Sequence, residues 1–204
     1  MIKSIIKALS AGAVAATFCV IGCGDDDDDG GGLSANTFRD SRDNTTYEKV
    51  TIGAQTWMAR NLDYAATGSA CYLNSIDSCS KYGRLYSWET ALTACPQGWH
   101  IPSDAEWTQL TDEIGGLSMA GVKLKFRSGW VHNNGMDQYG FSAMPGGFGY
   151  GGGFYGNGDN SYWWSSTEDG ADDAWSRHMN CHNEYMGRVS SSKNRQLSVR
   201  CVKN

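Results

Sequence analysis

The stretch Lys81–Leu110, KYGRLYSWETALTACPQGWHIPSDAEWTQL, decides the fold because it contains two short helices joined by a proline-set turn. Ser87 can cap the first helix, and Pro96 ends it because proline lacks an N–H and restricts the residue before it. Ser103 and Glu106 have the spacing of a capping box, which predicts the start of the second helix. We therefore expect a structural frame of two short helices joined by a turn.

The second helix has one apolar face that needs a partner. Trp107, Leu110 and Ile114 recur at helical spacing, and Gly115-Gly116 ends the run. Residues 99–101 between the helices are expected to be extended. The frame thus predicts an α+β domain whose helices cover small sheets.

The N-terminal segment has the pattern of a bacterial lipoprotein signal. Lys3 and Lys7 precede an apolar run over residues 8–21, which is shorter than the ~20 residues that span a bilayer. The run ends in Val20-Ile-Gly-Cys23, which resembles a lipobox. We expect residues 1–22 to be a signal peptide and Cys23 to become the acylated first residue. An ordinary signal peptide with an incidental cysteine is the alternative.

A tether is expected over residues 23–37. Asp25 to Asp29 and the glycines around them cannot bury surface, and their like charges favour an extended chain. Acidic residues behind a lipidated cysteine resemble surface-export signals of some diderm bacteria, and Gly24 follows Cys23 where inner-membrane retention signals have aspartate. We expect a lipid-anchored protein of the bacterial outer membrane, displayed at the cell surface.

Residues 38–204 are long enough for one domain with its own core. The formal net charge of the chain is −5, and five of its acidic residues lie in the tether. A domain with so little basic charge does not attract nucleic acid. We expect no nucleic-acid partner and no cofactor.

Five cysteines remain in the domain, in a compartment where thiols tend to pair. Cys71 and Cys79 enclose a short polar loop and form the obvious local pair. Cys95 at the end of the first helix can pair with Cys201 in the last strand. Cys181 is then left over, and Cys181 with Cys201 is the rival pairing.

Several segments have strand patterns. Residues 38–64 alternate in polarity between tight-turn residues, which predicts a small antiparallel sheet. Residues 121–130 fit either a half-buried strand or a strand after a frayed helical turn. Residues 139–170 are dense in glycine and aromatic residues and predict a long irregular loop. Further strands are expected at Tyr162–Ser166, Ala174–Asn180 and Leu197–Val202.

The glycine- and aromatic-rich segment is the candidate binding region. Aromatic rings stack on the apolar faces of sugars, amide and carboxylate groups take the hydroxyls, and glycines allow close approach. One of two adjacent tryptophans should face inward, and we expect this to be Trp164. The alternative is that both tryptophans fill the core while the glycines make turns. The candidate ligand-binding residues are Tyr150, Phe154, Tyr155, Asn157, Asp159, Asn160 and Trp163, with Tyr162 beside them.

Two clusters could hold metal ions, but we predict no metal site at either. The carboxylates of Glu168, Asp169, Asp172 and Asp173 could take calcium, although a solvated loop is the favoured interpretation. Soft ligands are offered by His178, Cys181 and His182, for which exposed strand residues are favoured. No serine elbow, metalloprotease helix or opposed carboxylate pair is recognisable, so we predict no catalytic residues.

The chain from Asp40 onward resembles the Fibrobacter succinogenes major paralogous domain, a module of exported bacterial proteins. The resemblance implies that the family's cysteines are Cys71, Cys79, Cys95 and Cys201, which leaves Cys181 unpaired. The segments that carry it are Asp40-Ser-Arg-Asp43, Tyr47, Val50-Thr-Ile-Gly53, Gln55-Thr-Trp-Met-Ala59, Asn61-Leu62, Tyr82-Gly-Arg-Leu-Tyr86, Cys95-Pro-Gln-Gly-Trp-His100, Trp107, Gly140-Phe-Ser-Ala143, Pro145-Gly146, Trp164-Ser-Ser-Thr167 and Ser198-Val-Arg-Cys201.

More distantly, residues 101–107 and 199–201 resemble the superfamily of C-type lectin-like and formylglycine-generating (sulfatase-modifying-factor-like) proteins. This implies an α+β fold of two short helices with small antiparallel sheets and long irregular loops. The calcium-binding motifs of the lectins are absent. The formylglycine-generating enzymes need a pair of reactive cysteines, and only Cys181 is available here.

Three functional hypotheses follow. The first is a non-catalytic surface lipoprotein that binds carbohydrate or another extracellular ligand through the glycine- and aromatic-rich region. The second is a structural or protein-interaction module of the cell envelope. The third is a metal or thiol oxidase that uses Cys181 with His178 and His182, and it is disfavoured.

Overall fold

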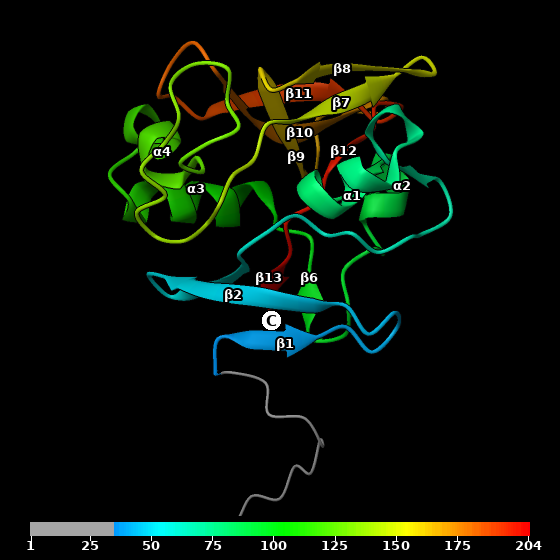
Figure 1. The fold of residues 1–204 in the computed structure, drawn as a ribbon, viewed down its shortest axis with the longest axis horizontal. Helices are drawn as coiled ribbons and strands as arrows, with labels where there is room; N and C mark the ends of the chain where they lie inside the picture. The colour runs from blue at the N-terminus through cyan, green and yellow to red at the C-terminus, as the bar shows by residue number, and fades with distance from the viewer. Residues whose placement is uncertain (1–34) are drawn as a thin grey trace, which may run out of the picture. The chain divides into compact units, whose positions relative to one another are not determined.

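Two β-sheets carry the domain, and helices lie between and beside them (Figure 1). The computed structural model describes residues 35–204; the predicted signal peptide, Cys23 and most of the predicted tether lie outside the described residues. The helices are η1 (Tyr72–Asn74), α1 (Ile76–Tyr82), α2 (Trp88–Ala91), α3 (Asp104–Glu113) and α4 (Leu117–Leu124).

The first sheet has the strand order β1-β2-β3-β13-β6 and brings residues from both ends of the domain together. The antiparallel pairing of β2 with β3 confirms the small sheet predicted over residues 38–64. Its strands are β1 (Thr37–Arg39), β2 (Thr46–Ile52), β3 (Gln55–Met58), β6 (Trp99–His100) and β13 (Val202–Lys203).

The second sheet has the order β11-β10-β9-β12-β5-β4, and a β7–β8 hairpin joins it through β7 and β9. The predicted last strand over 197–202 is therefore two short strands, one in each sheet. The strands of this sheet are β4 (Ser69–Ala70), β5 (Leu85–Tyr86), β7 (Gly146–Tyr150), β8 (Gly153–Asn157), β9 (Asn160–Glu168), β10 (Asp173–Asn180), β11 (Gly187–Ser192) and β12 (Leu197–Ser198).

The strands predicted at Tyr162–Ser166 and Ala174–Asn180 are confirmed as parts of β9 and β10. The long irregular loop predicted around the first of them, over residues 139–170, is wrong, because this segment contains all of β7, β8 and β9. Its glycines hide the strand pattern, since they replace the β-branched residues that usually mark a strand. In β7 and β8 the glycines make room for neighbouring side chains, as described below.

The helical frame is confirmed with one change of length. Ser103 Oγ accepts from Glu106 N at 3.2 Å and Glu106 Oε2 accepts from Ser103 N at 2.7 Å, which is the predicted capping box. The first helix, α2, ends at Ala91 and not at Cys95. After Ala91 the chain continues in tighter 3-10-type turns, in which each N–H donates to the carbonyl three residues earlier, as Ala94 N does to Ala91 O. Such turns often end an α-helix.

Two further α-helices were not predicted. The loop between Cys71 and Cys79 contains the start of α1, where a polar loop was expected. The ambiguous segment 121–130 is helical up to Leu124, and Lys125 then becomes extended and bridges to Ala143. The described residues therefore form an α+β domain with four α-helices instead of two.

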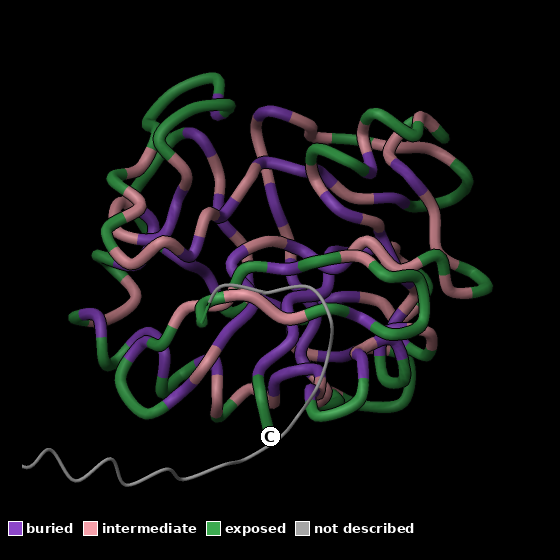
Figure 2. The backbone as a smooth tube through the Cα atoms, turned by 60° about the horizontal axis from the view of Figure 1, so that its bottom comes forward, coloured by how far each residue is buried: buried purple, intermediate pink, exposed green. Residues whose placement is uncertain are grey.

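The core consists of two apolar clusters on opposite sides of β9, and Figure 2 shows buried residues concentrated in the interior of the domain. Trp163 belongs to one cluster and Trp164 to the other, because neighbouring residues of a strand point to opposite faces. Trp164 faces inward as predicted, and its Nε1 donates to Tyr86 O at 2.8 Å.

A buried arginine joins distant parts of the chain between the sheets. Arg200 Nη2 donates to Asn61 Oδ1 at 2.7 Å, and its Nη1 donates to Met58 O at 3.1 Å and to Phe141 O. Burial lowers the pKa of Arg200 to about 9, so the guanidinium stays charged at neutral pH. This cation holds residues 58–61, 141 and 200 in one place.

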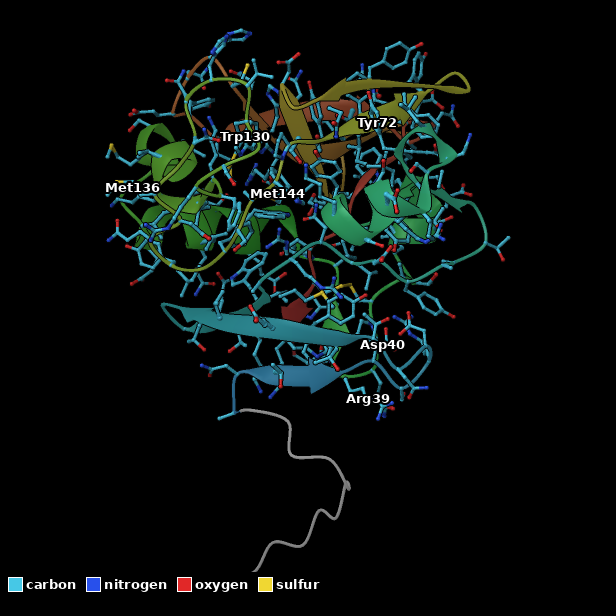
Figure 3. All side chains as sticks on the ribbon, in the orientation of Figure 1. Arg39, Asp40, Tyr72, Trp130, Met136 and Met144 are labelled. Atoms are coloured by element: carbon cyan, nitrogen blue, oxygen red, sulfur yellow. A yellow bond between two sulfur atoms is a disulfide. The ribbon has the colours of Figure 1, made fainter. Side chains whose placement is uncertain are left out.

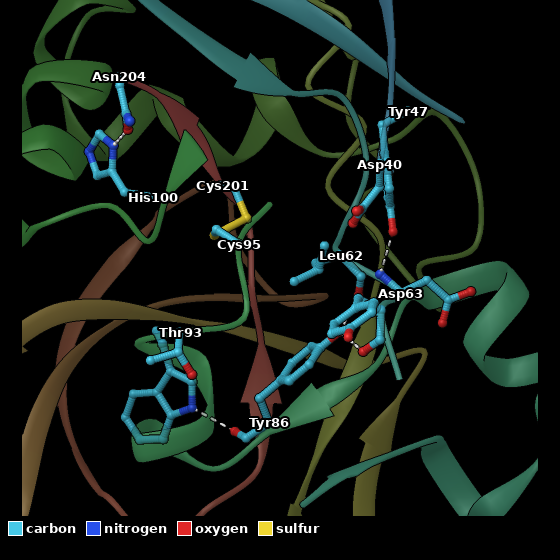
Figure 4. The surroundings of a disulfide bond; sticks show 12 residues. Asp40, Tyr47, Leu62, Asp63, Tyr86, Thr93, Cys95, His100, Cys201 and Asn204 are labelled. Atoms are coloured by element: carbon cyan, nitrogen blue, oxygen red, sulfur yellow. Dashed lines mark hydrogen bonds between the residues drawn. A yellow bond between two sulfur atoms is a disulfide. The ribbon is translucent and has the colours of Figure 1, made fainter. Parts of the chain in front are cut away.

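Both predicted disulfides are present. Cys71 pairs with Cys79, and Cys95 pairs with Cys201 across a sequence separation of 106 residues (Figure 4). The longer loop corresponds nominally to ~4–5 kcal/mol of unfolded-state entropy. Cys181 is free and buried, so its rival pairing with Cys201 is wrong.

Candidate functional site

The β7–β8 hairpin positions the aromatic side chains that the sequence singled out. Its turn is Gly151-Gly152, whose φ angles of 59° and 81° suit a two-residue hairpin. The register pairs Phe148 with Tyr155 and Tyr150 with Gly153. The three aromatic side chains therefore share one face of the hairpin, because cross-strand partners point the same way.

The glycines of the hairpin make room for the protein's own side chains. A Cβ at Gly153 would lie 2.6 Å from Tyr155 Oη, so the tyrosine ring lies over this glycine. A Cβ at Gly149 would lie 2.7 Å from Gln196 Oε1 on the other face. Gly149 and Gln196 also exchange two backbone hydrogen bonds of 2.8 Å, which fasten the hairpin to the segment before β12.

Four rings from four strands form a continuous row, which we call the aromatic row: Tyr155 of β8, Phe148 of β7, Tyr162 of β9 and His178 of β10. The ring centroids are 5.6 Å apart for Tyr155 and Phe148, and 5.3 Å apart for Phe148 and Tyr162. The rings of Tyr162 and His178 stack at 4.2 Å. Tyr155 and the adjacent Tyr150 are each 51% exposed, so the hairpin end of the row is open to solvent.

The inner end of the row is uncharged at neutral pH. Burial, with the nearby charge of Lys125, lowers the pKa of His178 to about 4. Asn160 Oδ1 lies 3.0 Å from His178 Nε2. Burial also raises the pKa of Tyr162, which keeps its phenol protonated. The row therefore presents neutral rings with polar edges, which suits the faces and hydroxyls of sugars.

A cation lies beside the exposed end of the row. The guanidinium carbon of Arg195 is 5.3 Å from the ring centre of Phe148 and 5.6 Å from that of Tyr150. These are cation–π distances. The site thus combines exposed aromatic rings with one positive charge.

The structure brings together only part of the predicted ligand-binding set. Tyr150 and Tyr155 share the exposed face of the hairpin. Phe154 lies on the opposite face and is half-buried, with its ring centroid 5.5 Å from that of Tyr72 (Figure 3). Its partner position in β7 is Gly149, which leaves space on that side.

The polar members of the predicted set are half-buried and bind the protein itself. Asn157 Nδ2 donates to a backbone carbonyl at 3.2 Å. Asp159 Oδ1 accepts from Cys181 Sγ at 3.4 Å, and Asn160 contacts His178 as described. Of these, only Asn160 touches the aromatic row.

The prediction that Trp163 faces a ligand is wrong. Its side chain is fully buried, and its Nε1 donates to Asn61 Oδ1 at 2.8 Å. The alternative, that Trp163 and Trp164 both fill the core, is confirmed. Both are buried because β9 has a core cluster on each face.

The sequence interpretation missed Phe148, Arg195 and the role of His178. Phe148 precedes Tyr150 by two residues, so strand alternation would have found it once the segment was recognised as a strand. Arg195 and His178 come from distant segments, and no local pattern joins them to the hairpin.

The acidic cluster of Glu168, Asp169, Asp172 and Asp173 lies next to the ammonium group of Lys193. Lys193 Nζ lies 3.3 Å from Glu168 Oε1 and donates to the carbonyls of Ala171 at 2.8 Å and Gly170 at 3.2 Å. Within residues 35–204, no group of three or more His, Cys, Asp or Glu side chains is arranged to hold a metal ion.

Within the described residues, Cys181, His178 and His182 do not form a metal-ligating group. Cys181 Sγ donates to Asp159 Oδ1 at 3.4 Å, while His182 is exposed with its ring 6.5 Å from that of His132. Burial and the Asp159 carboxylate raise the pKa of Cys181, which favours the protonated thiol. The other cysteines of the described domain are in disulfides, so no second thiol stands beside it.

The fold and the aromatic row define a disulfide-bridged α+β domain that displays rings from a glycine-rich hairpin. Residues 50–203 match the model of the Fibrobacter succinogenes major domain, and the chain belongs to this family. No curated protein and no solved structure matches the chain. Across residues 35–204 no helix has the length and apolar character needed to cross a bilayer.

Proposed function

We propose that the domain is a non-catalytic binding module that holds carbohydrate on the aromatic row. The observation that carries this proposal is the row itself, whose end residue Tyr155 is half-exposed together with the adjacent Tyr150. Exposed tyrosines supply large apolar contact area at low entropy cost, and their hydroxyls reach polar partners. The exposed faces of Tyr150 and Tyr155 suit stacking of sugar rings.

The test is binding to insoluble polysaccharides and to a glycan array, with Tyr155→Ala and Tyr150→Ala beside the wild type. We expect each variant to weaken binding ~10-fold, which is the loss of one stacking contact of about 1.4 kcal/mol. Met136→Ala is the matched control, because Met136 is 57% exposed and lies beside α4 in Figure 3. Equal binding by all variants, or none by the wild type, would remove the glycan proposal.

The anchoring proposal comes from the N-terminal sequence: the lipobox at Cys23 and the tether point to a lipid-anchored protein at the outer surface of the outer membrane. Mass spectrometry of the N-terminal peptide from a membrane fraction should show acylated Cys23, and Cys23→Ala should release the protein from membranes. Protease treatment of intact cells tests surface display, since a protein in the inner leaflet would be protected.

We also infer that the fold is of the C-type lectin-like and sulfatase-modifying-factor-like type. Two features support this: the last strand β13 lies between β3 and β6, and the Cys95–Cys201 bridge ties the chain end to the helical frame. Superposition of an experimental structure onto lectin-like domains is the test. A different strand order around the terminal strand would contradict the assignment.

A second candidate function, a protein-interaction module of the envelope, is favoured by the tip of the Cys71–Cys79 loop. Leu73 and Ile76 are 66% and 68% exposed, and Leu73 is held at φ 53°, which a bulky residue rarely adopts. A photo-crosslinking residue at position 73 should then give a discrete protein adduct in cells. The control is the same residue at Leu92, which is 40% exposed at the end of α2 and should give none. Equal labelling from both positions would argue against it.

The oxidase hypothesis has the least support. Cys181 is buried and protonated, and it has no thiol partner within residues 35–204. Stoichiometric copper or zinc in the purified protein would revive it.

A further inference from the structure

Arg195 is a positioned cation without a protein acceptor. Its guanidinium makes ring contacts with Phe148 and Tyr150, and within residues 35–204 its side chain has no hydrogen bond or ion pair. The ammonium of Lys193, two residues earlier, instead makes an ion pair with Glu168 and donates to two backbone carbonyls. The N–H donors of Arg195 therefore remain free beside the exposed end of the aromatic row.

The backbone of Arg195 holds this position. Arg195 N donates to Ser192 O at 2.9 Å in the turn after β11, and the next residue, Gln196, is bonded to Gly149 of the hairpin. The guanidinium is thus attached next to the hairpin that carries Tyr150. Its side chain is half-buried, so less rotational freedom is lost when a ligand binds.

Two cations, Arg195 and Lys125, lie near the row although the whole chain is acidic. The charge that acts on Tyr162 is that of Arg195, and the charge that acts on His178 is that of Lys125. The row therefore favours a ligand with negative charge over a neutral one.

The chemistry of a guanidinium selects among anions. Its planar fork of N–H groups matches the two oxygens of a carboxylate, and such a charge-assisted pair adds direction as well as affinity. A sugar ring on Tyr150 or Tyr155 would bring a carboxylate on that sugar toward the adjacent guanidinium. This arrangement requires both the rings and the cation.

We infer that the ligand of the aromatic row is an acidic polysaccharide whose sugars carry carboxylate groups, and that Arg195 is the residue that selects it. The inference rests on the proposed carbohydrate binding and adds the charge of the ligand to it.

The experiment compares two polymers that differ only in charge: polygalacturonate and the same polymer after chemical reduction of its carboxyl groups. Affinity electrophoresis of the purified full chain measures binding to each, with Arg195→Gln, Arg195→Lys and Tyr155→Ala beside the wild type. Arg39→Gln is the matched control, because it removes the same charge from an exposed site on β1 (Figure 3). Thermal melting of each variant checks that it is folded.

We expect Arg195→Gln to weaken binding to polygalacturonate at least ~10-fold, because a charge-assisted hydrogen-bonded pair is lost. Binding of the reduced polymer should be unchanged. Arg195→Lys should retain part of the binding, and Arg39→Gln all of it. Tyr155→Ala should weaken the binding of both polymers.

Two results would overturn the inference without touching the proposed function: equal wild-type binding of both polymers, or equal loss for both in Arg195→Gln. Equally tight binding of dextran sulfate would show a general preference for anions and would overturn the choice of carboxylate. Absence of wild-type binding to both polymers and to the glycan array would overturn the inference and the proposed function together.

Discussion

The tryptophans of the core and the rings of the aromatic row are the same class of side chain in opposite situations. Seven of the eight tryptophans in the sequence are buried; the exception, Trp175, is half-buried. Trp163 and Trp164 each donate their N–H to a buried oxygen. Tyr150 and Tyr155 are half-exposed, and the structure gives their hydroxyls no hydrogen-bond partner within residues 35–204.

This contrast shows that an aromatic-rich segment holds two kinds of ring with different roles. A buried ring with a satisfied N–H stabilises the fold through its apolar area. An exposed ring without a polar partner adds little to stability but keeps its face and hydroxyl available. Substitutions should therefore separate stability from binding.

The largest loss of stability is expected for Trp163→Ala. Removing a fully buried indole leaves a cavity and deprives Asn61 of a donor, so the free energy of unfolding should fall by ~4 kcal/mol. Urea unfolding followed by circular dichroism measures this. Trp175→Ala is the control, and its half-buried ring should matter less. A loss below ~1 kcal/mol for Trp163→Ala would break the contrast.

The next largest effect is expected for Asn61→Ala, which tests the polar partner of the inner ring. Asn61 Oδ1 accepts from Trp163 and Arg200, and its Nδ2 donates to Tyr82 O at 2.8 Å. Truncation leaves buried donors unpaired and should reduce the unfolding free energy by ~2–4 kcal/mol. The neighbouring Arg60→Ala should reduce it by less than ~1 kcal/mol in the same urea titration.

A smaller change in the unfolding free energy is expected when the pH is lowered, because of His178 at the inner end of the aromatic row. Its folded pKa of about 4 lies below the usual 6.5, so between these values the unfolded chain takes up a proton that the folded imidazole does not. Stability from neutral His178 is therefore present above pH 6.5 and lost as the pH falls toward 4, by of order 1–3 kcal/mol.

His178→Phe keeps a ring stacked on Tyr162 and removes this titration. Its unfolding free energy should change less with pH between 6.5 and 4 than that of the wild type. Identical pH profiles for the two proteins would show that His178 titrates normally.

The smallest stability change is expected for Tyr155→Ala. A half-exposed ring at the end of a hairpin should contribute within ~0.5 kcal/mol, so thermal melting should hardly differ from that of the wild type. The same variant should lose binding, as proposed above. A large fall in melting temperature would place Tyr155 with the core rings and weaken its assignment as a ligand contact.

Features with a local signal were predicted correctly from the sequence. The capping box depends on Ser103 and Glu106 three residues apart, and the sheet of β2 and β3 on alternation within a short segment. The Cys71–Cys79 pair is separated by only eight residues. Cys95–Cys201 was favoured over the rival Cys181–Cys201 because it ties the last strand back to the helical frame, and the family resemblance supported that choice.

Features that depend on distant strands were missed or misplaced. The hairpin of β7 and β8 was expected to be a loop, since its glycines carry no strand signal until Gln196 and Tyr155 are seen to occupy their space. Trp163 was assigned to the surface because alternation within β9 does not reveal that both its faces are covered.

The sequence by itself determined the capped helix, the antiparallel pair of β2 and β3, the Cys71–Cys79 bridge and the family, because short-range backbone preferences and short cysteine spacing are local properties of the chain. The structure was needed to show that Cys95, and not Cys181, pairs with Cys201. Only the tertiary structure decided which rings are buried and that Arg195 lies beside Tyr150. Burial and proximity depend on pairing between segments far apart in the chain, and no local preference encodes that pairing.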